Sequence, residues 1–250
     1  MNPFQPLEEV LARREKQIKV FFRDDDGGWA DERLQKLGDE FIQHELPLDV
    51  AVIPGALSSR SIDVIDALLG AKGRVAIHQH GFDHVNHQLS GRSCEFGSDR
   101  NRIQQHDDIA LGQNKLNEVF GARVDPVFTP PWNRCTSDTA FALQSLGFQS
   151  LSRIIGSEEI ENAVPELPVA VDWLKKRKGV RLTTAELINY ISGLFDNEAE
   201  VIGIMLHHEH MDHGNRTMLY QFIDTLRDSQ KVSFHSMMNL SVPANPGMAG

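Results

Sequence analysis

Cysteine is scarce in this chain, because only Cys94 and Cys135 occur among its 250 residues. Neither cysteine stands in a Cys-x-x-Cys pattern, which excludes the usual thiolate zinc motifs and dithiol redox motifs. We therefore expect two ordinary thiols rather than a disulfide.

Long apolar runs and an excess of basic residues are also lacking. No apolar stretch approaches the ~20 residues that a membrane-spanning helix requires, and residues 1–19 lack the apolar core of a signal peptide. The formal net charge of −10 argues against a nucleic-acid-binding protein, which would carry a basic surface. We expect a cytoplasmic protein without a membrane span or a nucleic-acid partner, and the oligomeric state stays open.

The chain does show a regular alternation of strand-like and helix-like segments. The strand-like segments are residues 18–23, 48–53, 74–78, 125–129, 148–152, 167–171, 201–206 and 231–235. Apolar residues recur at helical spacing in residues 31–44, 61–69, 103–120, 137–146, 183–194 and 215–227. Repeated strand–helix units predict parallel strands with right-handed crossovers.

This alternation predicts an α/β fold, namely a distorted (β/α) barrel with seven or eight parallel strands. An open doubly wound sheet is the alternative. However, three aspartates follow the first strand where a nucleotide-binding sheet would have a glycine-rich phosphate loop. We expect a single domain over residues 1–240, and the composition of residues 241–250 is typical of a flexible tail.

Histidine is concentrated in two short clusters that contain eight of the eleven histidines. The clusters are His78, His80, His84 and His87, and then His207, His208, His210 and His213. Imidazole and carboxylate groups are the ligands that divalent transition metals prefer. Since the carboxyl ends of barrel strands meet on one face, the histidine clusters and the aspartate run predict a mononuclear metal site there.

Five residues at these strand ends are the first candidates for chemistry. His80 and His84 are four residues apart and can face one metal, with Asp26 as a third ligand and one position left open for water. Asp25 could act as a general base, and His207 could protonate a leaving amine. Of the remaining residues in these runs, Asp24 is expected at a helix N-terminus or pointing outward, and the roles of His208, His210 and His213 stay open.

Four short segments, in the right order, resemble the motifs of the polysaccharide deacetylases of carbohydrate esterase family four, the NodB-homology proteins. They are residues 22–27 (Phe-Arg-Asp-Asp-Asp-Gly), 80–84 (His-Gly-Phe-Asp-His), 128–132 (Phe-Thr-Pro-Pro-Trp) and 205–207 (Met-Leu-His). Residues 78–87, 95–97 and 130–134 are similar to an intracellular-looking branch of that family. The resemblance extends from about residue 20 to residue 213.

The resemblance implies a role for each motif residue. Asp25 would be the catalytic base and His207 the general acid, while Asp26, His80 and His84 would bind the metal. Pro131 and Trp132 would form a wall of the substrate groove, and the backbone N–H of Trp132 would hold the oxyanion. Leu206 would line the acyl pocket.

This sequence departs from the family pattern at three points. Thr129 stands where the family has an arginine that orients the base, and Arg23, Arg100 or Arg134 could replace it. Only Asp172 and the tryptophan after it represent the fourth motif. The neighbouring His208 leaves the identity of the general acid open.

The resemblance implies a metal-dependent deacetylase of N-acetylated sugars, and the substrate is expected to be an oligosaccharide or a glycan precursor. One divalent ion is expected, with zinc as the default and cobalt or nickel as options. The first alternative is a metal-dependent hydrolase of a non-sugar amide or cyclic imide on the same fold. The second is a non-catalytic carbohydrate-binding relative.

Overall fold

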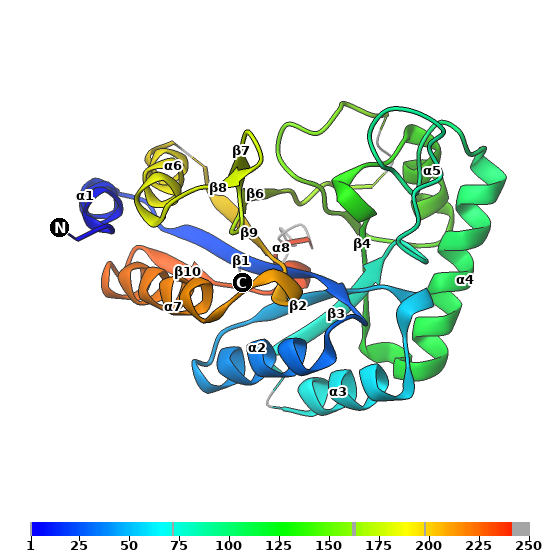
Figure 1. The fold of residues 1–250 in the computed structure, drawn as a ribbon, viewed down its shortest axis with the longest axis horizontal. Helices are drawn as coiled ribbons and strands as arrows, with labels where there is room; N and C mark the ends of the chain where they lie inside the picture. Colours follow the sequence, from blue (N-terminus) through cyan, green and yellow to red (C-terminus); the bar gives the residue numbers. More distant parts are fainter. Residues whose placement is uncertain (1, 72, 162–163, 198, 242–250) are drawn as a thin grey trace, which may run out of the picture.

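The computed structural model describes residues 2–71, 73–161, 164–197 and 199–241, and an eight-stranded parallel sheet forms its centre (Figure 1). The strands follow the order β5-β4-β3-β2-β1-β9-β6, and β10 pairs with the beginning of β1. Their bounds are β1 Ile18–Gly27, β2 Leu48–Val52, β3 Val75–His80, β4 Val124–Thr129, β5 Ser150–Leu151, β6 Val169–Asp172, β9 Val201–Leu206 and β10 Val232–Phe234. Each of the eight predicted strands is present, although β1 continues to Gly27 rather than ending at residue 23, and β3 continues to His80 rather than ending at residue 78.

The two edges of the sheet are joined by backbone hydrogen bonds, each between a residue of β5 or β6 and a residue just outside the other strand. The N–H of Leu167 donates to the carbonyl of Leu151 at 2.9 Å, and the N–H of Ile155 donates to the carbonyl of Val169 at 2.8 Å. The segment after β5 therefore pairs with the segment that leads into β6. The sheet is a distorted (β/α) barrel, as predicted, rather than an open doubly wound sheet.

Alternating side chains of β1 divide the apolar core into an outer and an inner part. Phe22 packs against Phe41 of the covering helix α2, with 5.2 Å between the ring centroids. The preceding residue, Phe21, belongs to a cluster with Val127 of β4 and Val169 of β6, which are not neighbours in the sheet. These inner contacts hold the curled sheet together across the barrel.

Most helices cover the outside of the barrel (Figure 1), whereas the last one contributes Met237 to the inner cluster of Phe21. Their bounds are α1 Gln5–Arg13, α2 Asp31–Gln43, α3 Ser59–Gly70, α4 Arg102–Phe120, α5 Ser137–Ser145, α6 Thr184–Asp196, α7 His213–Asp228 and α8 Met237–Ser241. Four single 3-10 turns occur at η1 Pro54–Ala56, η2 Gly121–Arg123, η3 Pro131–Asn133 and η4 His208–His210, and β7 Lys176–Arg177 with β8 Val180–Arg181 forms a small hairpin. Helices α2 and α3 lie next to each other, as do α4 and α5, and α1 packs on α6. Among the described residues, no helix is both long and apolar enough to cross a membrane.

The sequence analysis did not predict α1, α8 or the hairpin. Helix α1 has only nine residues and buries Leu7, Val10 and Leu11, so its stability depends on packing against α6. Of the predicted tail, residues 241–250, only Ser241 falls within the described part of the chain, where it ends α8.

Candidate metal centre

Three consecutive aspartates lie at the end of β1, and their surroundings differ. Because side chains alternate along a strand, Asp25 lies on one face and Asp24 on the other. Alternation alone would place Asp26 with Asp24. However, Asp26 has a left-handed backbone (φ 70°), where the pairing of β1 with β2 shifts register. Asp25 and Asp26 therefore line the same pocket, whereas Asp24 bonds to His208.

Asp25 is held by Arg23, which lies two residues earlier on the same face of β1. Arg23 Nε and Nη2 donate to the two carboxylate oxygens of Asp25 at 2.7 and 2.8 Å. The buried guanidinium also donates to Asn133 Oδ1 at 2.8 Å. Burial by itself raises the pKa of Asp25, but the charge of Arg23, followed by His80 and His207, outweighs it and keeps this pKa below its usual range. Asp25 is thus an ionised carboxylate in a fixed orientation.

Thr129, which stands at the position of the family arginine, has a different role. Its hydroxyl lies 2.8 Å from Nε2 of His78, and both residues are buried. Burial most of all, together with the charge of Arg23, lowers the pKa of His78 to about 3. The ring is neutral at pH 7, and the neutral hydroxyl of Thr129 is a suitable partner for it.

Arg23 therefore makes the contact with the predicted base that the resemblance assigns to an arginine at position 129. The other two candidate arginines have different partners. Arg100 pairs with Asp108, with 2.6 Å between Nη1 and Oδ2, and Arg134 donates to the carbonyl of Ser93 at 2.7 Å.

The three predicted metal ligands converge on one point. One ligand atom from each of Asp26, His80 and His84 lies within 4.8 Å of the others. Nε2 of His80 is 3.3 Å from Oδ1 of Asp26, and Nε2 of His84 is 3.4 Å from it. His80 Nδ1–H donates to the carbonyl of Thr129 at 2.9 Å, so that Nε2 is the ring nitrogen that faces Asp26.

This arrangement fits a divalent metal because it contains an unpartnered buried oxygen. Oδ1 of Asp26 is buried and has no hydrogen-bond partner. Burial raises the pKa of Asp26, but the adjacent imidazoles, led by His80, lower it more, so that the carboxyl is ionised. Two imidazoles and one carboxylate form the donor set of many catalytic zinc sites.

The loop that carries His84 is held by Glu95, whose role the sequence analysis did not identify. The buried Glu95 carboxylate accepts the backbone N–H groups of Phe82 at 3.3 Å and Asp83 at 2.8 Å. Burial raises the pKa of Glu95 to about 6. Gly81 has φ 56°, and a Cβ there would lie 2.1 Å from a carboxylate oxygen of Glu95, so this tight approach requires glycine.

Two tryptophans flank His84 and form walls of the pocket. Ring centroids of Trp29 and Trp132 lie 5.0 and 4.4 Å from that of His84. The pocket has a volume of about 520 Å³, and Asp172 and His207 also line it. Its rim includes three basic residues at the hairpin that were not predicted, Lys175, Lys176 and Arg181.

Two other predicted groove residues lie deeper. Leu206 is fully buried at the end of β9, and Pro131 is buried beside Gly81. The remaining tryptophan, Trp173, is part of the core. Both cysteines are free thiols, as expected.

The adjacent histidines His207 and His208 have opposite surroundings. His207 faces the pocket. His208 is buried, and its Nδ1–H donates to the carboxylate of Asp24 at 2.6 Å while its Nε2–H donates to the carbonyl of Trp29 at 2.8 Å. Both partners are acceptors, so the ring carries both protons. Burial lowers the pKa of His208, but Asp24 outweighs it and the pKa is raised to about 9.

This pair corrects the expectation that Asp24 lies at a helix N-terminus or points outward. Asp24 is buried, and its other carboxylate oxygen accepts the backbone N–H of His208 at 2.9 Å. Asp24 and His208 therefore support the pocket from the interior, whereas His207 and His210 line it.

Comparison with solved structures shows which proteins share this fold. A candidate polysaccharide deacetylase from Mycobacterium smegmatis matches with a TM-score of 0.67 and 18% identity, over 92% of this chain and 90% of that one. A family 4 acetyl xylan esterase from Clostridium thermocellum, in complex with a cobalt ion, matches with a TM-score of 0.60 and 13% identity, over 89% of each chain. The chitin deacetylase of the fungus Colletotrichum lindemuthianum matches with a TM-score of 0.60 and 13% identity, over 93% and 90%.

The same fold also occurs in a family-four pseudoenzyme from Bacillus anthracis, with a TM-score of 0.61 and 11% identity over 91% of this chain and 66% of that one. No family model matches the sequence, and no curated protein matches it either. The resemblance to family-four carbohydrate esterases that the motifs indicate is thus confirmed for the fold.

Proposed function

We propose that this protein is a metal-dependent hydrolase that removes acetyl groups from N-acetylated sugars or a glycan precursor. The observation that supports this most is the convergence of Asp26, His80 and His84 in a pocket that also contains Asp25 and His207. A ligand set, a fixed carboxylate and a histidine are the groups that amide hydrolysis needs in one place.

The residues of the pocket have complementary roles in this proposal. A divalent metal, when bound by the two histidines and Asp26, polarises an acyl carbonyl and lowers the pKa of a water molecule. Asp25 accepts a proton, and it keeps free lone pairs for this because a carboxylate has about four acceptor sites while Arg23 uses two. His207 donates a proton to the leaving amine. The backbone N–H of Trp132 is proposed to hold the oxyanion.

The absence of the family arginine at Thr129 supported the alternative that the substrate is a non-sugar amide or a cyclic imide. Arg23 supplies the equivalent contact with Asp25, which favours the deacetylase. The alternative of a non-catalytic binding protein is disfavoured because every predicted ligand and both predicted proton-transfer residues are present. A pseudoenzyme with this fold makes a direct activity measurement necessary.

The decisive experiment combines elemental analysis of the purified protein with acetate release. N-acetylglucosamine oligomers would be compared with simple acetamides and cyclic imides at the measured metal content. About one equivalent of zinc or a similar ion, with acetate released from the sugars, is the expected result. If only the imides are hydrolysed, the substrate is a cyclic imide rather than an acetylated sugar. If the metal-loaded protein binds sugars but hydrolyses none of the compounds, the proposed hydrolase activity is wrong.

A further inference from the structure

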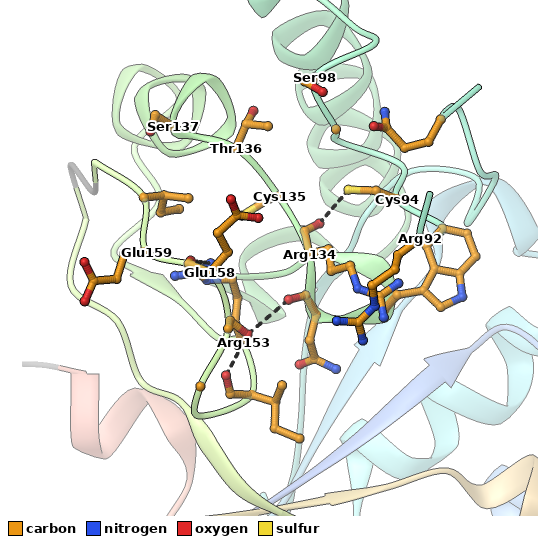
Figure 2. A pocket seen from close by; sticks show the side chains of 18 of the residues that line it. Arg92, Cys94, Ser98, Arg134, Cys135, Thr136, Ser137, Arg153, Glu158 and Glu159 are labelled. Carbon is orange, nitrogen blue, oxygen red and sulfur yellow. Dashed lines mark hydrogen bonds between the residues drawn. The ribbon is translucent and has the colours of Figure 1, made fainter. Parts of the chain in front are cut away.

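A second cavity of about 660 Å³ lies beside the candidate metal pocket (Figure 2). Trp132, Asn133 and Ile154 line both cavities, so the two adjoin along this wall. The remaining lining comes from residues 88–98, 134–137 and 153–160. A chain of sugar units with one unit in the metal pocket would place a neighbouring unit in this cavity.

Two arginines in this cavity carry positive charge that no carboxylate neutralises. Arg92 and Arg134 both line the cavity, and within the described ranges neither forms an ion pair at 4.0 Å or less. Arg134 donates one bond to the carbonyl of Ser93, which leaves its other N–H groups available. Burial and the nearby charge of Arg92 lower the pKa of Arg134, which indicates that the two cations lie close together.

The other charged residues that line the cavity, Arg153, Glu158 and Glu159, form no ion pair with Arg92 or Arg134 in the described part of the chain. Arg153 is paired with Glu166, through contacts of 2.7 and 3.1 Å, so it adds no free charge. Figure 2 shows Glu158 and Glu159 on the opposite side of the cavity from Arg92 and Arg134.

We propose that this cavity binds an oxyanion substituent, a carboxylate or a phosphate, on the sugar unit next to the one that is deacetylated. The inference rests on the proposed function, since that function places the acetylated unit in the metal pocket. Guanidinium groups donate paired N–H bonds to carboxylate and phosphate oxygens. Ser90 and Ser98 also line the cavity, and their hydroxyl groups suit the neutral hydroxyls of a sugar.

The first test measures binding without any acetyl group, so that it does not depend on deacetylation. Glucose, glucuronate and glucose 6-phosphate would be titrated calorimetrically into the metal-loaded protein and into Arg92→Gln/Arg134→Gln. A matched control, Arg60→Gln, removes one positive charge from the exposed face of α3, outside both cavities. Because an anion can also bind a metal, the titrations would be repeated in His80→Ala.

The expected result is that an anionic sugar binds at least about tenfold more tightly than glucose. The arginine double variant should lose this preference, while Arg60→Gln and His80→Ala keep it. The preferred anion then identifies the substituent as carboxylate or phosphate. The proposal is overturned if glucose binds as tightly as both anions, if the double variant keeps the preference, or if the preference disappears in His80→Ala alone.

The second test connects the cavity with turnover. For N-acetylated sugars with and without the preferred anion, the double variant should raise KM for the anionic substrate by about tenfold or more and leave kcat and the neutral substrate unchanged. Equal effects on both substrates would contradict the proposal. If no acetylated sugar is hydrolysed but the arginine-dependent binding is present, the deacetylase fails while the anion site stands.

Discussion

Two sets of buried aspartate and histidine side chains lie at the end of the barrel, and they differ in how completely their polar atoms are bonded. In the closed set, both carboxylate oxygens of Asp24 accept hydrogen bonds and both ring nitrogens of His208 donate them. In the open set of Asp26, His80 and His84, an oxygen of Asp26 has no partner and two Nε2 atoms face it.

The difference shows that residue type and burial do not distinguish a structural pair from a ligand set. Both sets consist of aspartate and histidine, and Asp24, Asp26, His80 and His208 are all buried. Buried polar groups in folded proteins are normally satisfied, so a buried carboxylate oxygen that lacks a hydrogen bond and is faced by two imidazole nitrogens fits a site for an ion. The closed set should therefore determine stability, and the open set should determine metal content and activity.

The largest expected effect comes from removing a member of the open set. His80→Ala should lose the bound metal and at least about a thousandfold of kcat/KM, because two remaining ligands hold a divalent ion poorly. Elemental analysis and acetate release would measure both. The matched control is His87→Ala, which removes a half-buried histidine of the same cluster and should keep both. Full turnover in His80→Ala would break the assignment of the open set.

The second prediction compares the same substitution, aspartate to asparagine, in the closed set and in the open set. Asp24→Asn leaves the charge of His208 buried without its partner and should lower the free energy of unfolding by about 3–5 kcal/mol. Asp26→Asn removes a carboxylate that faces two imidazole nitrogens but whose Oδ1 has no hydrogen bond to lose, so the metal-free protein should lose less stability than with Asp24→Asn.

Urea unfolding of both variants without metal would measure this difference. Equal destabilisation by the two substitutions would show that the open set is also structural. Circular dichroism before unfolding would establish that each variant is folded under the starting conditions.

The third prediction concerns Asp25, the aspartate between the two sets. Arg23→Lys keeps the positive charge but cannot form the bidentate contact, so Asp25 loses its fixed orientation. We expect kcat to fall by about ten- to a hundredfold with little change in metal content or KM. Arg100→Lys, at an arginine that pairs with Asp108 instead, is the control. A larger effect in Arg100→Lys would contradict the structural assignment.

The features of the fold and the site that could be predicted from the sequence are those that depend on residues close together in the chain. The eight strands were predictable because each is a short apolar run and helical patterns separate most of them. The contact of Arg23 with Asp25 was also within reach, since residues two apart on a strand share a face. Because the resemblance places the orienting arginine at position 129, where this chain has Thr129, the sequence analysis could not decide which of three other arginines replaces it.

The closed set could not be predicted in the same way. Asp24 and His208 are 184 residues apart in the chain and meet because β1 and β9 are neighbours, with Asp24 opposite Leu206 in the register. The position of Asp26 depends on a left-handed residue at a register shift, which has no signal in the run of three aspartates. Glu95 likewise lies 12 residues from the Asp83 N–H that it accepts. Pairing of distant segments, rather than local pattern, places these side chains.

The smallest expected effect is a pH dependence that belongs to the closed set alone. Burial lowers the pKa of His208, but Asp24 more than offsets this and raises it to about 9, whereas a histidine in the unfolded chain titrates near 6.5. Below about pH 6.5 both states carry the proton, and the pair contributes its full stability. As the pH rises toward 9, the unfolded state releases the proton first, so the folded state binds more protons and its stability falls.

The measurable quantity is the difference in free energy of unfolding between the metal-free wild type and Asp24→Asn from pH 6 to pH 10. It should be largest near pH 6 and should shrink steadily through about pH 9. His80 and His84 titrate in both proteins, so their contributions cancel in the difference to the extent that the two sets are independent. A difference that stays constant over this range would mean that His208 is neutral in the folded protein. The closed set would then be a hydrogen-bonded pair rather than an ion pair.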